Sequence, residues 1–446
     1  MSVTIEQLRS GIPSVAGWGK LEYTDWIDES ESWKKGCYLG EWSFLDELHV
    51  SGPDALKLFS DFAVNSFAKF HIGQAKHIIC CNRDGKIIGE GILMRFGIDE
   101  FEFQALGPVT AWLDYQLRAG GYDVQSEYRV SKFKFQVQGP SSVEVLEQLV
   151  GPRLRDVRFM HQHSFSVAGH ATLFLRQGMA GEIGFELQGP LVHADDVRKA
   201  ILSAGKASGI RRLGSRTAMI NHLEACFPTV THDYLPAVCE PSEREFLEDL
   251  SKRERLGIMK FRRWTLDGCL KAKGSFQAQD VSAWYRSPVE LGWARNVKFD
   301  HDFYGREALE REVANPRRKI MTLIWSAEDC QDVQNSLFAG DAEPYDFMDM
   351  PRQQRFCMDA HSVLADGKEV GVATSRSFSF TFRQMMSHCV IDLDKSEVGT
   401  KVEVIWGNPD KRQKRIRATV APSPYKKDLR RTELKTARAQ AQAQAL

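Results

Sequence analysis

Alternating strands and capped helices are mixed from about residue 38 to residue 314, and the strands are grouped. The stretches FEFQAL and FKFQVQG alternate polar and apolar residues, as half-buried strands do. PDALKLFSDFA (53–63) places a proline in the first turn of a helix, and SSVEVLEQLVG ends at Gly151, a typical C-terminal cap. Further helices are predicted from about Asp195 and over GSRTAMINHLEA (214–225). Because the strands do not alternate strictly with helices, this rhythm predicts an α+β fold.

The composition changes after NPRRKIMTLIW. GKEVGVATSRSFSFTF and GTKVEVIWG read as strand pairs with glycine-rich turns, which predicts a smaller β-rich domain. We therefore divide the chain into a core at 1–317, a β-rich domain at 318–422, and a tail at 423–446. That tail is first basic and then rich in alanine and glutamine, and is predicted to be a frayed helix.

The bulk composition is that of an ordinary globular protein. Lys+Arg and Asp+Glu each total 59 among 446 residues, so nothing overall indicates a nucleic-acid or membrane partner. The cysteines form no CxxC motif, so neither a zinc site nor a redox motif is visible, and their odd count fits a reducing compartment. The first residues lack an apolar signal core. We expect a cytoplasmic protein.

The stretch NRDGKIIGEGIL (82–93) reads as a turn followed by a strand. Strict alternation places Ile88, Glu90 and Ile92 on one face. A carboxylate between apolar neighbours is costly unless it is paired, and such groups gather at functional clefts. Flanking glycines allow a flat ligand to approach the backbone. The alternative is an edge strand whose face is partly in water.

A second carboxylate lies in RQGMAGEIGFELQGP (176–190). Glycines precede a short strand on which Glu186 shares a face with Gly184. A carboxylate offers two parallel acceptors, which match an amino group beside a ring N–H of a flat heterocycle. The alternative is a hairpin with an exposed glutamate.

Two other stretches carry candidate residues. Arg216, near the start of the helix at 214–225, serves either a ligand or a surface ion pair, and surface pairs are commoner. Asp300, His301 and Asp302 resemble metal ligands, but three adjacent residues on an extended segment point to alternating sides. We therefore expect a turn before a helix near Tyr304 and no metal. Core packing is the default for Trp284 and Tyr285.

Taken together, six stretches resemble the folate-dependent aminomethyltransferase family, the T-protein of the glycine cleavage system and its relatives. They are VSGPDALKLF, NRDGKIIGEGIL, VQGPSSVEVL, GMAGEIGFEL, LGSRTAMINHLEA and SPVELGW…GREAL, in the order and spacing of that family. The resemblance spans roughly residues 20–422. It implies a folate-binding fold of two interleaved α+β subdomains with a C-terminal β-barrel. Glu90 matches the family's catalytic carboxylate, although Gly89 replaces an aspartate, and Glu186 matches the pterin-binding glutamate.

Within that family, GMAG, GSR, AGGY and VKFDHDF followed by GREAL are similar to the bacterial aryl-methyl-ether O-demethylases of the vanillate and 3-O-methylgallate type. This resemblance implies methyl transfer from an aromatic methoxy group, such as that of vanillate or syringate, to N5 of tetrahydrofolate. Tyr285 matches the branch's active-site tyrosine and would assist the leaving phenolate. Glu90 would orient the folate. The further implied folate contacts are Glu186, Arg216, Gln138 and Trp293.

The chain departs from that branch on the substrate side. A His-His pair is replaced by Ser43-Phe44, and an arginine near Leu106 is absent, so the substrate or its carboxylate anchor differs. The aromatic N-terminal stretch around Trp42 would form the wall of the substrate site, beside Ser43. Arg95 is the further substrate-binding candidate, and Arg129 and His49 are polar residues near the same strands.

Other readings remain open at this point. KGCYLGE (35–41) is similar to the cysteine motif of folate-binding proteins that assist iron–sulfur cluster maturation, but there the motif lies late in the chain and continues differently. The remaining alternatives are an aminomethyl- or methyltransferase acting on an amine or sulfonium substrate, and a non-catalytic folate-binding protein.

Overall fold

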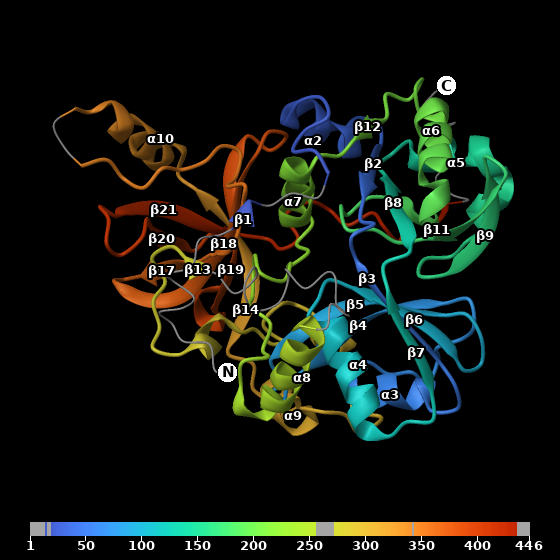
Figure 1. Ribbon diagram of the computed structural model, residues 1–446. Coiled ribbons are helices and arrows are strands. Elements are labelled where there is room, and N and C mark those ends of the chain that lie inside the picture. Colours follow the sequence, from blue (N-terminus) through green and yellow to red (C-terminus); the bar gives the residue numbers. More distant parts are fainter. Residues whose placement is uncertain (1–13, 16–18, 256–271, 341–342, 435–446) are drawn as a thin grey trace.

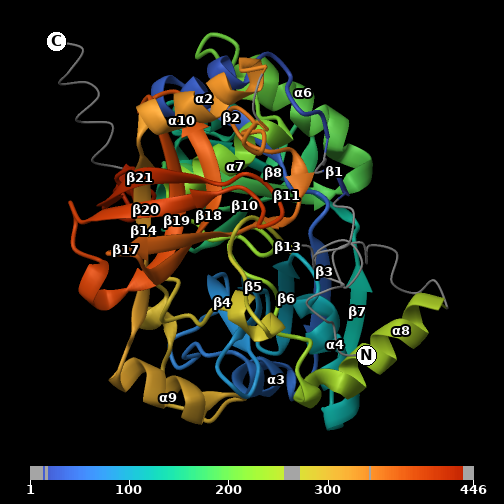
Figure 2. The same ribbon diagram turned by 90° about the vertical axis from the view of Figure 1, so that its left-hand side faces the viewer.

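The structure is a computed structural model that describes residues 14–15, 19–255, 272–340 and 343–434. The alanine/glutamine part of the predicted tail, 435–446, lies outside these residues. The described chain contains an open antiparallel sheet, an open mixed sheet, one closed barrel, and helices packed on their outer faces (Figures 1 and 2). No helix of the described part is long and apolar enough to cross a membrane.

The first sheet has five strands in the order β4-β5-β6-β3-β7, all antiparallel. Helices α3 and α4 pack on one of its faces, and α8 lies beside α4 (Figure 1). The bounds are β3 Asp46–Ser51, β4 Ala75–Cys81, β5 Ile87–Arg95, β6 Glu100–Ala105, β7 Gln125–Arg129, α3 Ala55–Phe62, α4 Val109–Gly120 and α8 Arg244–Arg255.

The second sheet has six strands in the order β12-β2-β8-β11-β10-β9, and helices α5 and α6 cover one face. The bounds are β2 Tyr38–Glu41, β8 Lys132–Gln138, β9 Gln162–Val167, β10 His170–Leu175, β11 Gly184–Pro190, β12 Arg211–Arg212, α5 Ser142–Val150 and α6 Ala194–Ala204. The two sheets are joined by a reciprocal pair of amide hydrogen bonds between Gln104 and Gln188, of 2.7 and 2.9 Å. The faces that carry these two glutamines therefore lie toward each other.

The closed barrel has the order β14-β19-β18-β17-β20-β21 and encloses its own apolar cluster, which confirms the expected C-terminal β-barrel. Its strands are β14 Arg318–Trp325, β17 His361–Ala365, β18 Lys368–Ser379, β19 Gln384–Asp392, β20 Lys401–Trp406 and β21 Lys414–Ala421. Helix α7 (Ser215–Glu224) packs against β18 and β19 and lies between the barrel and the six-stranded sheet (Figure 1). Helices α2 (Trp26–Lys35), α9 (Arg306–Ala314) and α10 (Ala327–Asn335) complete the arrangement.

The remaining elements are short. Two-stranded pairs are formed by β1 with β15 and by β13 with β16. Their bounds, with those of the 3₁₀ turns, are β1 Ser14–Val15, β13 Ala272–Lys273, β15 Arg355–Phe356, β16 Met358–Asp359, η1 Pro152–Asp156, η2 Leu191–His193, η3 Pro241–Glu243, η5 Val281–Trp284, η6 Ala294–Asn296, η7 Ser336–Phe338 and η8 Leu393–Lys395.

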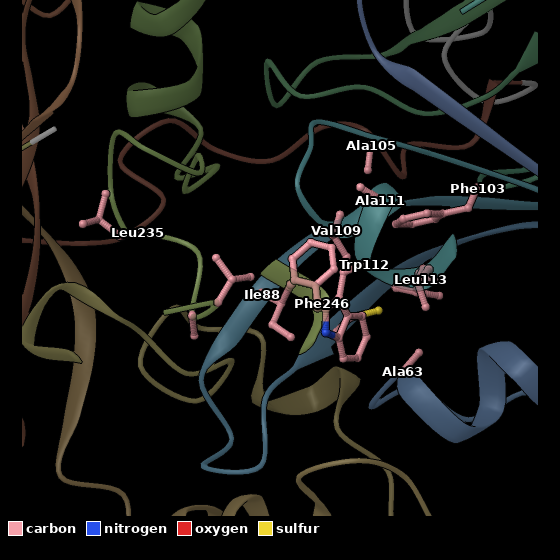
Figure 3. Packing of buried hydrophobic residues seen from close by; sticks show 14 of the residues in the cluster. Ala63, Ile88, Phe103, Ala105, Val109, Ala111, Trp112, Leu113, Leu235 and Phe246 are labelled. Atoms are coloured by element: carbon pink, nitrogen blue, oxygen red, sulfur yellow. The ribbon is translucent and has the colours of Figure 1, made fainter. Parts of the chain in front are cut away.

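A β-bulge changes the faces predicted for β5. Cys80 pairs with Gly89, but Cys81 pairs with Ile87, so Ile88 is the extra residue. Ile88 therefore packs in the cluster under α4, together with Trp112 and Phe246 (Figure 3), and not on the face of Glu90. The prediction that Ile88 shares that face was wrong, because strict alternation does not survive a bulge.

The glycines beside Glu90 serve packing. A Cβ at Gly89 would lie 2.6 Å from Cβ of Val109, and one at Gly91 would lie 2.4 Å from the carbonyl oxygen of Gln104. Helix α4 and strand β6 therefore approach the bare backbone from the face opposite Glu90. The prediction that these glycines admit a flat ligand was wrong, because protein atoms already fill that space.

Candidate active site

A cavity that opens to solvent, with about 820 Å³ of space including its open side, is lined by both N-terminal sheets, helix α7 and the loop that follows it. Glu90 of β5 and Glu186 of β11 line the same cavity from different sheets. The other lining residues are Trp42, Phe44, Leu45, Gly91, Ile92, Gln104, Ala105, Leu106, Gln177, Met179, Met219, His222, Phe227, Thr229, Val230 and His232.

Glu186 is the polar feature of the cavity wall formed by the six-stranded sheet. It lies between Leu175 of β10 and Gln136 of β8 in the strand register. Its Oε1 accepts a hydrogen bond of 3.0 Å from Nε2 of Gln136. Burial raises the pKa of Glu186, and hydrogen bonds from Gln177 and Gln136 oppose that shift. The carboxylate keeps acceptor capacity for a donor in the cavity.

Glu90 is paired with a histidine that the sequence analysis missed. Nε2 of His77 lies 2.8 Å from Oε2 of Glu90, and side-chain exposures are 20% and 15%. Nδ1 of His77 lies 3.4 Å from Nδ2 of Asn296, and the His77 ring packs edge-on against Trp293. His77 is a polar residue on β4, the strand that pairs with the strand of Glu90. The sequence does not show that the two side chains meet, because that depends on the pairing register. A hydrogen-bonded carboxylate and imidazole form a pair that can carry a proton.

One wall of the cavity is aromatic and includes a neutral histidine. Trp42 and His222 stack with ring centroids 6.5 Å apart, and Phe227 packs against His222 at 5.4 Å. Burial, and then the charge of Arg352, lower the pKa of His222 to about 3. Its Nδ1 lies 3.1 Å from Oγ1 of Thr229. This wall therefore offers flat apolar surface without a fixed charge.

Arg352 places a buried positive charge near this wall. Its side chain is 6% exposed, and within the described residues its guanidinium makes no hydrogen bond or ion pair. Its charge lowers the pKa of both His222 and His232, which line the cavity. An anionic group in the cavity would therefore meet a favourable field from the side of the barrel domain.

Tyr285 does not line this cavity. It is 2% exposed and lies in the apolar cluster beneath the five-stranded sheet, with Trp284 and Leu235. Its hydroxyl lies beside the thiol of Cys239, and burial raises its pKa. A more weakly acidic hydroxyl away from the cavity is poorly suited to assist a leaving group there. The structure therefore does not bring Tyr285 together with Glu90.

Two predicted folate contacts hold parts of the protein together instead. Arg216 lies 2.9 Å from Oε1 of Glu22 and does not line the cavity, so it forms the surface ion pair that was the alternative. Gln138 accepts hydrogen bonds from the Tyr38 hydroxyl (3.1 Å) and the Ala180 amide (3.1 Å), and donates to the Gln177 carbonyl at 3.0 Å. Its amide group is committed to holding the loop at 177–180.

Among the predicted substrate contacts Trp42, Ser43 and Arg95, only Trp42 lines the cavity. Trp42 lines the cavity, whereas Ser43 accepts a hydrogen bond from the Lys134 amide at 3.1 Å and does not. Arg95 donates to three backbone carbonyls, those of Phe70, Gly97 and Ile98.

The remaining polar candidates on these strands lie outside the cavity. Arg129 pairs with Glu47, Glu102 and Glu127. His49 lies 3.8 Å from Glu100. Neither side chain lines the cavity of Glu90 and Glu186.

The remaining predictions concern Trp293, the possible metal ligands at 300–302 and the cysteine motif at 35–41. Trp293 lines a second cavity that adjoins the first. Among the described residues no group of three or more His, Cys, Asp or Glu side chains could hold a metal ion. His301 bonds to the Ala63 carbonyl and to Asp300. Burial raises the pKa of Cys37, in the KGCYLGE stretch, to about 12, which leaves an unreactive thiol.

Known proteins resemble this chain over almost its whole length. Residues 13–243 match the GCVT N-terminal domain family. A sesamin methylene transferase of Sinomonas sp. is 33% identical, covering 95% of this chain and 94% of that protein. A syringate O-demethylase of Sphingobium sp. is 30% identical, covering 93% of this chain and 91% of that protein. An aminomethyltransferase of Caldanaerobacter subterraneus is 23% identical, covering 88% of this chain and 87% of that protein.

A solved structure shows the same fold. The glycine cleavage system aminomethyltransferase T from Bartonella henselae superimposes with a TM-score of 0.66 at 18% identity, covering 95% of this chain and 96% of that one. The expected fold class is therefore confirmed.

Proposed function

The chain belongs to the GCVT N-terminal domain family, and on that basis we propose that it is a tetrahydrofolate-dependent O-demethylase of aromatic methyl ethers. Aryl ether and N5 of the folate yield a phenol and 5-methyl-tetrahydrofolate: the carbon–nitrogen bond forms as the methyl–oxygen bond breaks. The observation that carries the proposal is the meeting of Glu90 and Glu186, from two different sheets, in one cavity with an aromatic wall.

The cavity fits a pterin by its chemistry. Glu186 presents acceptor oxygens that match the amino and ring N–H groups of a pterin. The aromatic and apolar side chains of Trp42, Met219 and Phe227 give a flat ring surfaces to pack on. The folate supplies the nucleophilic nitrogen that accepts the methyl group; the protein holds it in place.

The His77–Glu90 pair is the best placed proton carrier. Overall, the attacking nitrogen loses a proton and the departing phenolate gains one. A carboxylate and an imidazole 2.8 Å apart at the cavity wall can accept and return that proton. Since positioning of two bound reactants contributes several kcal/mol, about 7–11 in favourable cases, the protein needs little further chemistry.

Arg352 supplies a positive field that favours an anionic substrate in the cavity, without lining it. The two substrate-anchoring features of the O-demethylase branch are missing from this sequence. The unpaired buried guanidinium does not itself line the cavity, but its charge acts on His222 and His232, which do. We therefore favour an anionic aromatic substrate such as vanillate or syringate.

Methylene transfer is the second candidate, because the Sinomonas relative carries that activity in its name and covers 95% of this chain. The two reactions give different products on the same co-substrate. The purified protein is incubated with tetrahydrofolate and a panel of methoxybenzoates and methylenedioxybenzoates, and the folates are separated by mass. We expect 5-methyl-tetrahydrofolate with a methoxybenzoate. Methylene-tetrahydrofolate alone would support the second candidate, and unchanged tetrahydrofolate with every aromatic would overturn both.

A further inference from the structure

One wall of the active-site cavity is the loop at 226–234, which follows helix α7 and which we call the wall loop. It supplies Phe227, Thr229, Val230 and His232 to the lining of the cavity. Among the described residues of the closed barrel, none lines that cavity. The barrel can therefore affect the reaction only through elements such as the wall loop, which lie between it and the bound reactants.

The backbone of the wall loop is strained at two places. Cys226 (φ 49°) and Thr231 (φ 66°) both lie in the left-handed region, which a β-branched residue such as threonine rarely adopts. Thr231 is completely buried, and among the described residues its hydroxyl has no hydrogen-bond partner. A conformation of this kind persists only where the surrounding structure holds it in place.

Two neighbouring barrel strands hold a carboxylate of the wall loop. Thr374 of β18 and His388 of β19 lie directly opposite each other in the strand register. Oγ1 of Thr374 donates a hydrogen bond of 2.7 Å to Oδ1 of Asp233, and Nδ1 of His388 lies 2.9 Å from the same oxygen. Oδ2 of Asp233 accepts a hydrogen bond of 2.8 Å from the backbone N–H of Thr229. Asp233 therefore closes the wall loop on itself and ties it to the barrel.

The surroundings of His388 require a proton on both ring nitrogens. Burial would raise the pKa of Asp233, but the charge of His388 and its hydrogen bond lower it to about 2, so this carboxyl group is ionised and can only accept. Nε2 of His388 lies 3.2 Å from the backbone carbonyl oxygen of Leu223, in the last turn of α7, which also can only accept. Since the two side chains are 1% and 2% exposed, they form a buried ion pair.

We propose that His388 is a positioning residue, which as an imidazolium holds Asp233 and the end of α7 and so keeps the strained wall loop in the shape that aligns the bound reactants. This inference rests on the proposed function, since alignment is measured by turnover. His388 itself does not line the cavity and acts through the residues of the wall loop. A displacement of about 1 Å can lower a rate about 100-fold, so a small movement of the loop is enough.

The protonation of His388 is tested by NMR of protein labelled with ¹⁵N at histidine. At pH 7 one imidazole should carry a proton on both nitrogens, and its signals should be absent from the spectrum of His388→Asn. Asp233→Asn should also lose this doubly protonated state, because a neutral amide no longer balances the charge of the imidazolium. A singly protonated His388 in the wild type would overturn the proposal, and this measurement decides it even where a variant fails to fold.

Turnover separates positioning from stability alone. His388→Leu removes both donors and should lower turnover about 10- to 100-fold at saturating tetrahydrofolate and methoxybenzoate. His388→Asn keeps an N–H donor near the place of Nδ1 and should recover most of that loss. The control is Asp329→Asn, which weakens an ion pair of 2.8 Å with Arg417 between α10 and β21 and should keep wild-type turnover. Every assay is run below the unfolding transition of the variant, so that lost stability alone does not lower the rate.

The outcomes separate the two proposals. Wild-type turnover in His388→Leu, or an equal loss in Asp329→Asn, would overturn the positioning role and leave the proposed function standing. An equal loss in His388→Leu and His388→Asn would show that the contact with Asp233 is not what matters, and would also overturn it. Absence of turnover in the wild type with every aromatic would overturn the proposed function, and the NMR signal of His388 would then decide whether the ion pair holds the wall loop.

Discussion

At the scale of single residues, Glu186 gives the most direct test of the folate site. Glu186→Gln keeps the shape and the hydrogen bond with Gln136 can re-form, but the charged acceptor is lost. A hydrogen bond to a charged group contributes about 1.5–3 kcal/mol, so tetrahydrofolate affinity should fall roughly 10- to 150-fold. Calorimetry measures it, and Glu127→Gln, on an exposed side chain, is the matched control. Unchanged affinity would remove Glu186 from the pterin site.

The His77–Glu90 pair is tested by turnover. Replacing either residue by glutamine should lower the rate of 5-methyl-tetrahydrofolate formation by roughly 10²- to 10⁴-fold, the range for lost proton transfer. If the two act as one unit, the double variant should be no slower than the slower single variant, because each single change already disables the pair. Additive losses would mean that they act separately.

Tyr285, unlike His77 and Glu90, should not take part in the reaction. Because its hydroxyl lies in the apolar cluster beside Cys239 and not in the cavity, Tyr285→Phe should leave turnover close to that of the wild type. A large loss with an aryl ether would restore the role that resemblance alone assigned to Tyr285. The resemblance located the carboxylates from local motifs, whereas the surroundings of Tyr285 depend on contacts with distant segments such as residue 239.

At the scale of elements, local signals predicted much of the chain. The helix ending at Gly151 was correctly bounded, because that glycine adopts a positive φ of 80° at the cap. The faces of β5 were not, because the bulge opposite Cys80 and Cys81 arises from pairing between strands. His77 was missed for the same reason. Elements whose structure depends on neighbouring residues along the chain can be predicted from the sequence. A site assembled from two sheets can be predicted only in part, because it depends on how distant strands pair.

Gly89 tests the contact between β5 and α4. Gly89→Ala would place a methyl group 2.6 Å from Cβ of Val109, so strand and helix must separate. Overpacking of this kind costs about 1–3 kcal/mol, and turnover should also fall because Glu90 is the next residue. Chemical denaturation measures the free energy of unfolding. Gly340→Ala, where no atom lies within 4 Å of the added methyl group, should change neither quantity. Wild-type stability of Gly89→Ala would contradict this packing.

At the scale of the whole molecule, Glu224 joins three parts of the fold. The side chain of this α7 residue is fully buried and accepts hydrogen bonds from Lys34 (2.8 Å) and Trp33 (3.2 Å) of α2 and from Ser379 (2.5 Å) of the barrel. Glu224→Ala leaves the Lys34 ammonium, only 12% exposed, without its partner, so the free energy of unfolding should fall by about 3–5 kcal/mol. Glu31→Ala breaks the exposed pair with Lys35 and should cost at most about 1 kcal/mol. Similar losses in both variants would contradict the joining role of Glu224.

The stability of the whole molecule should also depend on pH through His222, the neutral histidine in the cavity wall. In the unfolded chain a histidine has a pKa of about 6.5, whereas burial and Arg352 lower that of His222 to about 3. Its folded pKa is depressed, so the stabilisation is fully present above pH 6.5 and is lost as pH falls toward 3, because the unfolded state binds the proton first. At pH 5 this one group should lower the free energy of unfolding by about 2 kcal/mol relative to pH 8. Denaturation of wild type and His222→Gln at both pH values measures the difference, with the exposed His163→Gln as control. If His222→Gln shows the same loss between pH 8 and pH 5 as the wild type, His222 is not held neutral by its burial.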